Sequence, residues 1–377
     1  MKILYVTTIS DTVNAFLVPH IKWLVENGNE VALAFNTNQE VNPELISAGC
    51  KVYHIEFQRN PLKKENLKAY QKIRNVILNE GFNLIHVHTP VASFITRLAC
   101  RNIRGVKVLY TAHGFHFFKG APKRNWVLYY TLEKIVSRWT DGIITMNEED
   151  YGSAKKLSLR ESNSIYKIHG IGLDLNRFTP QTVERKNHLR NKYGYEKTDF
   201  ILIYVGELSY RKQQDLLIKA ISHLKEEIPH IKLLLVGEGE RLLEYKELVM
   251  CNGVGNNVEF MGFRNDVHNL MAIADIAIST SRQEGLPVNV MEAMATGLPL
   301  VVTDCRGNRD LVTNGENGYI VHIDDALACA NRIKKLYQSN DLREAFAKSN
   351  KEKIRKYEIK QVLIEMEEIY DKQSLNL

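Results

Sequence analysis

Ile231-Lys232-Leu233-Leu234-Leu235-Val236 is a nearly continuous apolar run, which is typical of a strand buried on both faces of a parallel sheet. Short runs of this kind alternate with helical patterns along almost the whole chain. We expect strands at 2–8, 30–35, 51–55, 83–88, 106–112 and 142–145, and again at 199–205, 232–236, 257–260, 276–279 and 300–303. Strands that alternate with helices indicate βαβ units, so the sequence predicts an α/β protein with parallel sheets.

The strand–helix series stops once and restarts, which predicts two doubly wound domains. The length of 377 residues also suits two domains. The break falls at Gly170-Ile171-Gly172, shortly before Pro180, where a hinge is plausible. We therefore expect an N-terminal domain over 1–172, a C-terminal domain over 173–354 and a charged helical tail over 355–377. Further helices are expected at 16–26, 62–80, 91–101 and 123–139.

The composition is that of a soluble globular protein, with 44% hydrophobic and 25% charged residues. No apolar run reaches 18 residues, and the segment Met1–Val6 lacks the features of a signal peptide, so we expect a cytoplasmic protein. The five cysteines form no CxxC pair, which argues against a disulfide framework and a zinc site.

The excess positive charge lies in the first half of the chain. Residues 1–175 carry 22 Lys and Arg against 15 Asp and Glu, a net of +7, whereas residues 176–377 carry 28 against 29, a net of −1. Within residues 101–140 there are eight basic residues and one acidic residue, Glu133. This asymmetry indicates an anionic partner: nucleic acid, anionic lipid or a phosphorylated substrate.

The helix expected over 123–139 has two faces. An apolar stripe at helical spacing would pack on the core: Leu128, Leu132, Ile135, Val136 and Trp139. The other face is aromatic and basic: Trp126, Tyr130, Lys134 and Arg138. Together with Lys119, Lys123 and Arg124, this face could lie on an anionic membrane; the alternative is a solvated amphipathic helix. No nucleic-acid motif is present, so we do not expect a nucleic-acid partner.

Ligands of open α/β sheets bind beyond the carboxyl ends of the strands. Polar residues follow the expected strands in both halves: Thr8, Ser10, His88, His113 and Asn147, and then Glu207, Glu238 and Glu284. We expect the two sheets to face each other, so that these edges meet in one interdomain cleft.

The stretch from Glu284 to Gly297, EGLPVNVMEAMATG, predicts a diphosphate site. Pro287 suits the first position of a helix and Gly297 suits the position after its end. The free N–H groups at the start of this helix would bind an anion, flanked by Glu284 and by Glu292 about 6–8 Å further along. The alternative is that Glu284 caps the helix and Glu292 is solvated.

Two glycine-containing loops are further candidates. In Gly206–Gln213, Arg211 and Lys212 could hold a diphosphate, or could simply be exposed on a turn. Gly237-Glu238-Gly239 lacks the third glycine of a dinucleotide fingerprint, so we expect no nicotinamide cofactor.

His113 follows a strand and precedes Gly114, which is compatible with a catalytic or substrate-orienting role; the equal alternative is a histidine that only hydrogen-bonds within the loop. His86 and His88 share one face of a strand, but no third ligand lies at a suitable spacing, so we expect no metal site.

These motifs resemble glycosyltransferase family 4, in the branch that builds bacterial capsular polysaccharides and exopolysaccharides. The most specific element is Glu284 and Glu292 with Gly285-Leu286-Pro287 between them. Four other stretches fit in order: Ala112-His113-Gly114-Phe115, Gly206-Glu207-Leu208-Ser209 with Lys212, Gly237-Glu238-Gly239, and Phe260 to Asp266. The resemblance implies the GT-B fold, in which two Rossmann-like domains face each other across a cleft. It also implies a nucleotide-sugar donor bound by the C-terminal domain, retention of anomeric configuration, no obligatory metal and a tail helix that crosses back to the N-terminal domain.

The resemblance also assigns roles to residues. Glu284 would bind donor sugar hydroxyls with help from Gly285, Leu286, Pro287 and Val288, and Glu292 would bind the ribose. Lys212 would bind the diphosphate, His113 would lie near the reacting carbon, and Glu238, Phe263 and Arg264 would complete the donor site. The sequence departs from the family pattern at two places. Glu207 stands where many members have an arginine, and Arg211 could compensate for that loss. The first loop, Ser10–Ala15, lacks the paired glycines of many members, so the resemblance does not imply which acceptor is used.

The resemblance and the charge pattern together predict a retaining transferase with a UDP-sugar donor and a polyprenyl-diphosphate-linked glycan acceptor. The enzyme would lie peripherally on the inner face of the cell membrane. A nucleotide-sugar epimerase of the same fold and a non-catalytic nucleotide-sugar or glycan-binding protein stay open as alternatives.

Overall fold

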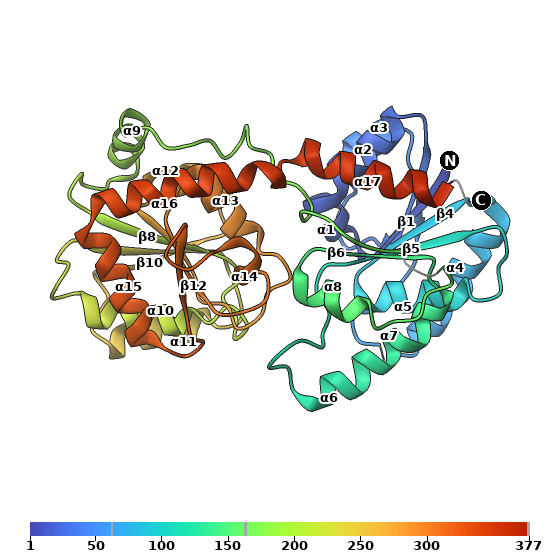
Figure 1. Cartoon of the computed structure of the whole chain (residues 1–377), viewed down its shortest axis with the longest axis horizontal. Coiled ribbons are helices and arrows are strands. Elements are labelled where there is room, and N and C mark those ends of the chain that lie inside the picture. The colour runs from blue at the N-terminus through green and yellow to red at the C-terminus, as the bar shows by residue number, and fades with distance from the viewer. Residues whose placement is uncertain (62, 162–163, 375–377) are drawn as a thin grey trace. The chain divides into compact units, whose positions relative to one another are not determined.

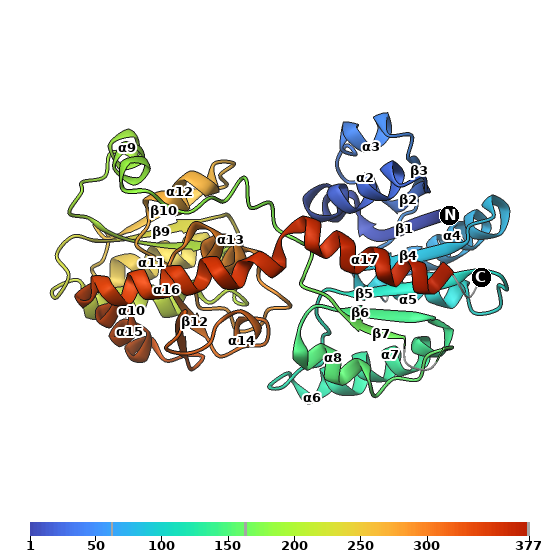
Figure 2. The same ribbon diagram turned by 45° about the horizontal axis from the view of Figure 1, so that its top comes forward.

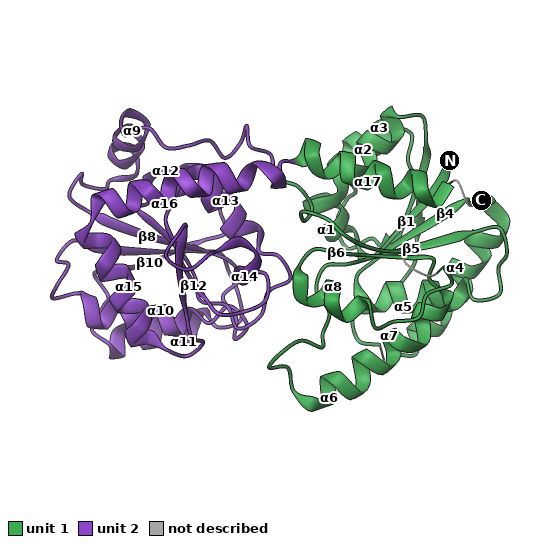
Figure 3. Cartoon of the chain, in the orientation of Figure 1, with its two compact units in different colours: residues 1–172, 359–377 green, residues 173–358 purple. Residues whose placement is uncertain are grey.

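The computed structural model describes residues 1–61, 63–161 and 164–374. Leu62, the expected start of one helix, and the last three residues of the expected tail lie outside this part. The chain divides into two compact units, residues 1–172 with 359–377 and residues 173–358 (Figure 3). Each unit is a parallel sheet covered by helices, as the alternating pattern predicts.

The sheet of the first unit has the strand order β3-β2-β1-β4-β5-β6-β7, and the paired neighbours run parallel (Figure 1). Its strands are β1 Lys2–Ile9, β2 Glu30–Asn36, β3 Lys51–His54, β4 Leu84–His88, β5 Lys107–Ala112, β6 Gly142–Thr145 and β7 Ile165–Lys167. The order reverses between β1 and β4, and this switch point is where ligands of doubly wound sheets bind.

Helices of the first unit connect these strands. They are α1 Ser10–Thr12, the π-helix η1 Val13–Leu17, α2 Val18–Glu26, α3 Pro43–Ser47, α4 Glu65–Glu80, α5 Pro90–Ala99, α6 Lys123–Asn125, the π-helix η2 Trp126–Tyr130, α7 Thr131–Val136, the 3-10 helix η3 Ser137–Trp139, α8 Glu148–Ala154 and α17 Ile359–Ser374. The first helical segment begins at Ser10, so the expectation of a loop over Ser10–Ala15 was wrong.

The sheet of the second unit has the order β10-β9-β8-β11-β12-β13, with a switch point between β8 and β11. Its strands are β8 Phe200–Val205, β9 Ile231–Val236, β10 Val258–Gly262, β11 Ile276–Ser279, β12 Leu300–Thr303 and β13 Gly318–Val321. Its helices are α9 Val183–Tyr193, α10 Gln214–Leu224, α11 Leu242–Cys251, α12 Val267–Ile273, α13 Val288–Thr296, α14 Asn308–Leu311, α15 Ala326–Gln338, α16 Asn340–Lys353 and the 3-10 helix η4 Ile354–Tyr357.

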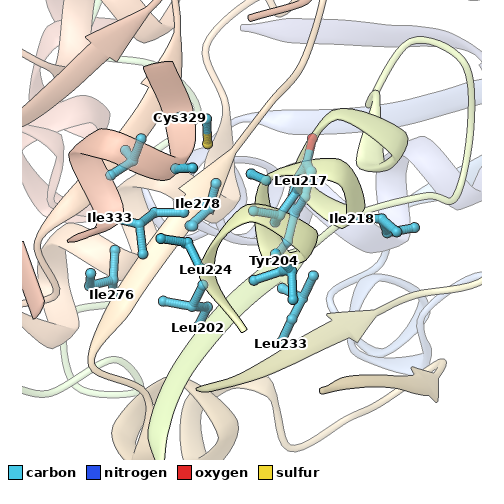
Figure 4. Packing of buried hydrophobic residues seen from close by; sticks show 14 of the residues in the cluster. Leu202, Tyr204, Leu217, Ile218, Leu224, Leu233, Ile276, Ile278, Cys329 and Ile333 are labelled. Carbon is cyan, nitrogen blue, oxygen red and sulfur yellow. The ribbon is translucent and has the colours of Figure 1, made fainter. Parts of the chain in front are cut away.

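Alternate residues of β8 and β9 pack on opposite faces of the sheet, which explains their continuous apolar sequences. Leu202 and Leu233 pack on one side with α10 residues such as Leu217 (Figure 4). Ile203 and Leu234 pack on the other side, with α13. Because both faces are covered, each strand exposes its polar groups mainly at its ends, where the candidate site lies.

Helix α17 belongs to the first unit, where it lies beside α2 (Figures 1 and 2). Its apolar side chains Val362, Met366, Ile369 and Tyr370 are buried there. None of the helices in the described residues is long and apolar enough to cross a bilayer.

Candidate active site

The centre of the site in the second unit is a buried ion pair at the carboxyl ends of its strands. Lys212 Nζ lies 2.7 Å from Glu284 Oε1, and Arg211 NH1 lies 3.3 Å from Glu284 Oε2. Burial alone would raise the pKa of Glu284, but the two cations hold it below its ordinary value. Glu284 is therefore ionised at neutral pH. The alternative of Lys212 as an exposed turn residue was wrong, because only 8% of it is exposed.

The backbone around Lys212 is fixed by three buried hydroxyls. Tyr204 donates a hydrogen bond to the Lys212 carbonyl at 2.6 Å, and Thr280 donates one to the Gln213 carbonyl at 2.7 Å. Tyr245 holds the carbonyl of Ser209 at 3.0 Å. Gln213 adopts a left-handed conformation with φ of 54°, which is strained for a non-glycine residue. Lys212 thus extends from a rigid support.

The Gly237-Glu238-Gly239 motif brings two loops into close backbone contact. A Cβ atom on Gly237 would lie 2.2 Å from the Gly206 carbonyl oxygen, and one on Gly239 would lie 2.2 Å from the Leu208 carbonyl oxygen. Both glycines are therefore required for the loop after β8 to pack on the loop after β9. The motif supports the Lys212 loop, and the Glu238 side chain is exposed beside it.

Helix α13 begins next to Glu284. Pro287 is its N-cap, with φ of −76° and ψ of 114°, so Val288 and not Pro287 is the first helical residue. Gly297 ends the helix in the left-handed conformation, as predicted. Pro287, and not Glu284, is at the N-cap position, and the Glu284 carboxylate bonds to Arg211 and Lys212.

Arg306 is a site residue that the sequence analysis missed. It is buried, and its Nε donates to the Glu284 backbone carbonyl at 2.8 Å. It follows β12, so extending the strand-end rule to that strand would have found it. The adjacent Gly307 lies so close to Gly285 that a Cβ atom would be 2.4 Å from the Gly285 carbonyl oxygen. Both residues fix the loop that carries Glu284, Gly285, Leu286 and Pro287.

Glu292 lies in a different electrostatic environment on α13. Burial raises its pKa to about 7, and Arg177 offsets this only in part. Glu292 is nevertheless partly exposed, so the alternative of a solvated helical residue holds in part. The two carboxyls of the Glu-x7-Glu motif differ in charge state near neutral pH, because only Glu284 has close cationic partners.

The remaining predicted donor residues lie on neighbouring loops. Phe263 is 72% exposed. Arg264 is held by Asp266 through two hydrogen bonds of 2.7 and 2.6 Å. Arg211 is partly exposed, and its NH2 lies 3.9 Å from Glu207 Oε2. The Glu207 carboxylate therefore lies beside Arg211, the residue that could compensate for the missing arginine at position 207.

At the switch point of the first unit, His113 pairs with His88. His88 Nδ1 and His113 Nε2 lie 3.1 Å apart. Burial lowers the pKa of His113 to about 4 and that of His88 well below its ordinary value, so both are neutral at pH 7. Asn147, another strand-end residue, caps α8 by accepting a hydrogen bond from the Asp150 backbone N–H. It is a structural residue in this geometry.

The predicted faces of the helical segment over 123–139 are confirmed only in part: Val136 is buried and Lys134 and Arg138 are exposed, as expected. Leu128 and Ile135 of the expected core stripe are exposed, at 51% and 43%. Trp126 and Tyr130 instead contact Phe117, with ring centroids 5.5 and 5.3 Å apart. Trp126, Leu128 and Tyr130 all lie within the π-helix η2, whose wider turn spaces side chains differently from a regular α-helix.

The exposed surface of this segment is apolar and basic. Val127, Leu128 and Ile135 are exposed, and the basic side chains beside them are Lys123, Arg124, Lys134 and Arg138. Glu133, the one acidic residue of this stretch, turns inward to the fully buried Arg97, with 2.9 and 3.0 Å hydrogen bonds. The surface thus presents positive charge next to apolar side chains.

Comparisons with known proteins agree with this arrangement. Residues 2–147 match the family described as Glycosyl transferase 4-like, and residues 185–353 match Glycosyl transferases group 1. The chain is 40% identical to EpsD of Bacillus subtilis, which is named as a glycosyltransferase, over 98% of this chain and 96% of EpsD. It is 28% identical to the UDP-Gal:alpha-D-GlcNAc-diphosphoundecaprenol alpha-1,3-galactosyltransferase of Escherichia coli, over 74% of this chain and 72% of that enzyme.

Solved structures show the same fold. Anabaena HepE in complex with UDP superposes with a TM-score of 0.81 at 20% identity, over 99% of this chain and 100% of HepE. WaaG, a glycosyltransferase of lipopolysaccharide biosynthesis, gives a TM-score of 0.75 at 17% identity, over 97% of this chain and 98% of WaaG. These neighbours have the GT-B fold, so the predicted fold family is confirmed.

Proposed function

This chain belongs to the group 1, family 4-like glycosyltransferases, and on that premise we propose that it transfers a hexose from a UDP-sugar to a polyprenyl-diphosphate-linked glycan with retention of configuration. Membership of this family makes the protein a hexosyltransferase-type enzyme. The observation that carries the more specific proposal is the Lys212–Glu284 pair beside the start of α13.

The donor would bind at the strand ends of the second unit. Cleavage of the sugar–phosphate bond leaves negative charge on the departing diphosphate. Lys212, Arg211 and the free N–H groups of α13 are the groups that would stabilise this charge. Glu284 would accept hydrogen bonds from sugar hydroxyls, and Glu292 from the ribose. UDP is the proposed nucleotide because the E. coli relative uses UDP-Gal and HepE binds UDP and UDP-glucose.

We propose that the reaction needs no metal ion. The cationic groups around Glu284 and the helix N-terminus can meet the diphosphate charge themselves. Activity should then be unchanged when EDTA is added to metal-free buffer. A metal requirement would contradict this part of the proposal.

The acceptor side is proposed from the first unit. The E. coli relative acts, by its name, on a diphosphoundecaprenol-linked sugar, and a Campylobacter jejuni relative likewise acts on a diphospho-undecaprenol-linked one. The apolar and basic surface of residues 123–138 would hold the enzyme on the anionic inner face of the membrane. His113 would lie near the reacting carbon of the donor.

The test is transfer of labelled hexose from UDP-Glc, UDP-Gal, UDP-GlcNAc or UDP-GalNAc to synthetic polyprenyl-diphosphate monosaccharides. We expect one donor to yield a lipid-linked disaccharide whose NMR anomeric signal shows retention. Glu284→Gln should abolish the product, and Glu240→Gln, a matched change at an exposed site of the same domain, should not.

The rival functions give different outcomes. An epimerase would convert the UDP-sugar without any acceptor, and a binding protein would be stabilised by UDP but release none. A nucleotide screen with UDP, GDP and ADP in thermal shift identifies the base, and preference for GDP would replace the proposed donor while keeping the transferase.

A further inference from the structure

His113 has an unusual hydrogen-bond partner, a second buried histidine. His88, at the end of β4, is 2% exposed, and its Nδ1 approaches His113 Nε2 at 3.1 Å. The two rings also stack, with centroids 5.3 Å apart. One proton must lie between these two nitrogens, because neutral imidazole has one donor and one acceptor nitrogen.

The other nitrogen of His88 decides which ring donates. Within the described residues, His88 Nε2 is buried and has no hydrogen-bond partner. If His113 donated to His88, the His88 proton would be on Nε2, and a buried N–H would be left unpaired. If His88 donates from Nδ1, Nε2 is left only as an unpaired acceptor. Orphaned buried N–H groups are rarer than under-satisfied acceptors in proteins, so the second arrangement is favoured.

The surroundings hold His88 in place. His86, its neighbour at a ring distance of 4.2 Å, is already bonded through Nε2 to Thr111 and through Nδ1 to Tyr370, both at 2.7 Å. His86 therefore cannot replace His113 as a partner. Tyr5 stacks on His88 with centroids 5.3 Å apart.

The backbone directly after His88 is strained, and its hydrogen bonds also hold His88 in place. Thr89 has φ of 59° and ψ of 140°, a conformation that β-branched residues rarely adopt. Its hydroxyl donates to the His88 carbonyl at 2.6 Å and accepts from the Thr8 backbone N–H at 3.0 Å. The strain persists because Thr8 fixes Thr89, and this fixes the end of β4 that carries His88.

We propose that His88 is a positioning residue that donates its Nδ1 proton to His113 Nε2 and so fixes His113 in the tautomer protonated on Nδ1. His113 then carries its proton on Nδ1, and in the proposed reaction this N–H would donate to an oxygen of the substrate. This inference rests on the proposed function for the part that concerns catalysis, whereas the tautomer itself does not depend on the reaction.

The first test is the tautomer, measured by 15N-edited NMR of uniformly labelled full-length protein. Signals of His113 are assigned by their loss in His113→Gln. We expect the wild-type His113 proton on Nδ1, and a mixture or the Nε2 form in His88→Phe, which keeps a stacking ring but has no donor. A wild-type His113 protonated on Nε2 overturns the proposal even if every His88 variant fails to fold.

The second test separates positioning from a merely structural role. His88→Asn places an amide N–H where Nδ1 lies, so it should keep most of kcat, whereas His88→Phe should lose at least about tenfold in kcat. The Kd for UDP should be unchanged in both, because the donor site lies in the other unit. Equal kcat values for the two folded variants would refute the positioning role.

The failure of the proposed function looks different. If His113→Gln keeps full transferase activity, the catalytic role of His113 is wrong, whatever its tautomer. If His113→Gln is inactive but His88→Phe is fully active, only the positioning proposal fails.

Discussion

Replacing Glu292 by Gln is expected to stabilise the free protein at alkaline pH while it weakens nucleotide binding. Glu292 lies on α13 with its pKa raised from 4.5 to about 7, mainly by burial. Gln keeps the size and the polar end of the side chain but cannot ionise. The substitution therefore removes the cost of burying a charge and little else.

The magnitude follows from proton linkage. A raised carboxyl pKa means that the folded protein holds the proton more tightly than the unfolded chain, so this contribution to stability is complete below pH 4.5 and is lost as the pH rises through about 7. At about 1.4 kcal/mol for each pH unit between these values, the loss reaches about 3 kcal/mol at pH 8. Because the side chain is partly exposed, screening by solvent reduces this figure, and we expect about 1–2 kcal/mol.

The assay is thermal unfolding of both proteins at pH 4.5 and at pH 8. At pH 8 the Glu292→Gln variant should unfold roughly 3–6 °C above wild type, and at pH 4.5 the two should coincide. Glu240→Gln, at an exposed position, should leave the pH dependence unchanged. A variant that is less stable than wild type at pH 8, or a difference that does not vary with pH, would refute the reasoning.

Nucleotide binding should change in the opposite direction. An ionised carboxylate accepts stronger hydrogen bonds from hydroxyl groups than a neutral amide does. UDP should therefore raise the melting temperature of wild type more than that of Glu292→Gln, and the difference should grow between pH 6 and pH 8.

The other predictions concern separate parts of the molecule. Lys212→Met removes the main counter-charge of a buried carboxylate, so it should lower the free energy of unfolding by about 3–5 kcal/mol in urea titrations and abolish transfer. Arg211→Ala should weaken UDP binding in calorimetry if this residue compensates for the glutamate at position 207; unchanged affinity would contradict that role. The double change Val127→Asp with Leu128→Asp should abolish co-sedimentation with phosphatidylglycerol vesicles and leave the thermal shift with UDP intact; retained sedimentation would refute the membrane surface. Tyr370→Phe removes a hydroxyl shared by two buried partners and should cost about 1–3 kcal/mol in chemical unfolding, with an unaltered free energy as the contrary result.

The fold was predictable because buried parallel strands have short, nearly continuous apolar sequences. The strands that escaped prediction, β7 and β13, lie at sheet edges and are only three and four residues long. None of the three residues of β7 is buried, so its sequence carries little of the apolar signal. β13 is mostly buried, but its run of four residues is short. Glycine at the start of β13 weakens that signal further.

Helical register was less predictable than helix position. The segments around η1 and η2 were expected as a loop and as a regular helix, and both contain π turns. A π turn changes which side chains face the core without changing composition, so a period of 3.6 residues does not describe the faces of the residues within it. This is why Leu128 was expected inside and is exposed.

Most individual site residues could be predicted because each follows one strand in the sequence. Contacts between them could not be predicted, because a contact depends on which strands are neighbours in the sheet and on their register. Lys212 and Glu284 could each be named from its own loop, but their contact depends on β8 and β11 being neighbours. The His88–His113 pair likewise follows from the register of β4 with β5, in which His88 pairs with Thr111. No local pattern contains that register.

The two carboxyl groups of the Glu-x7-Glu motif differ in how readily they ionise. Burial opposes ionisation of both, but Glu284 lies against Lys212 and Arg211 while Glu292 has only the more distant influence of Arg177. The two cations lower the pKa of Glu284 and so favour its charged form, and its loop is fixed by Arg306. Glu292 gains or loses its charge near neutrality. In the proposed donor site, the sugar end would thus be insensitive to pH and the ribose end sensitive to it, so any pH dependence of donor affinity between 6 and 8 should originate at Glu292.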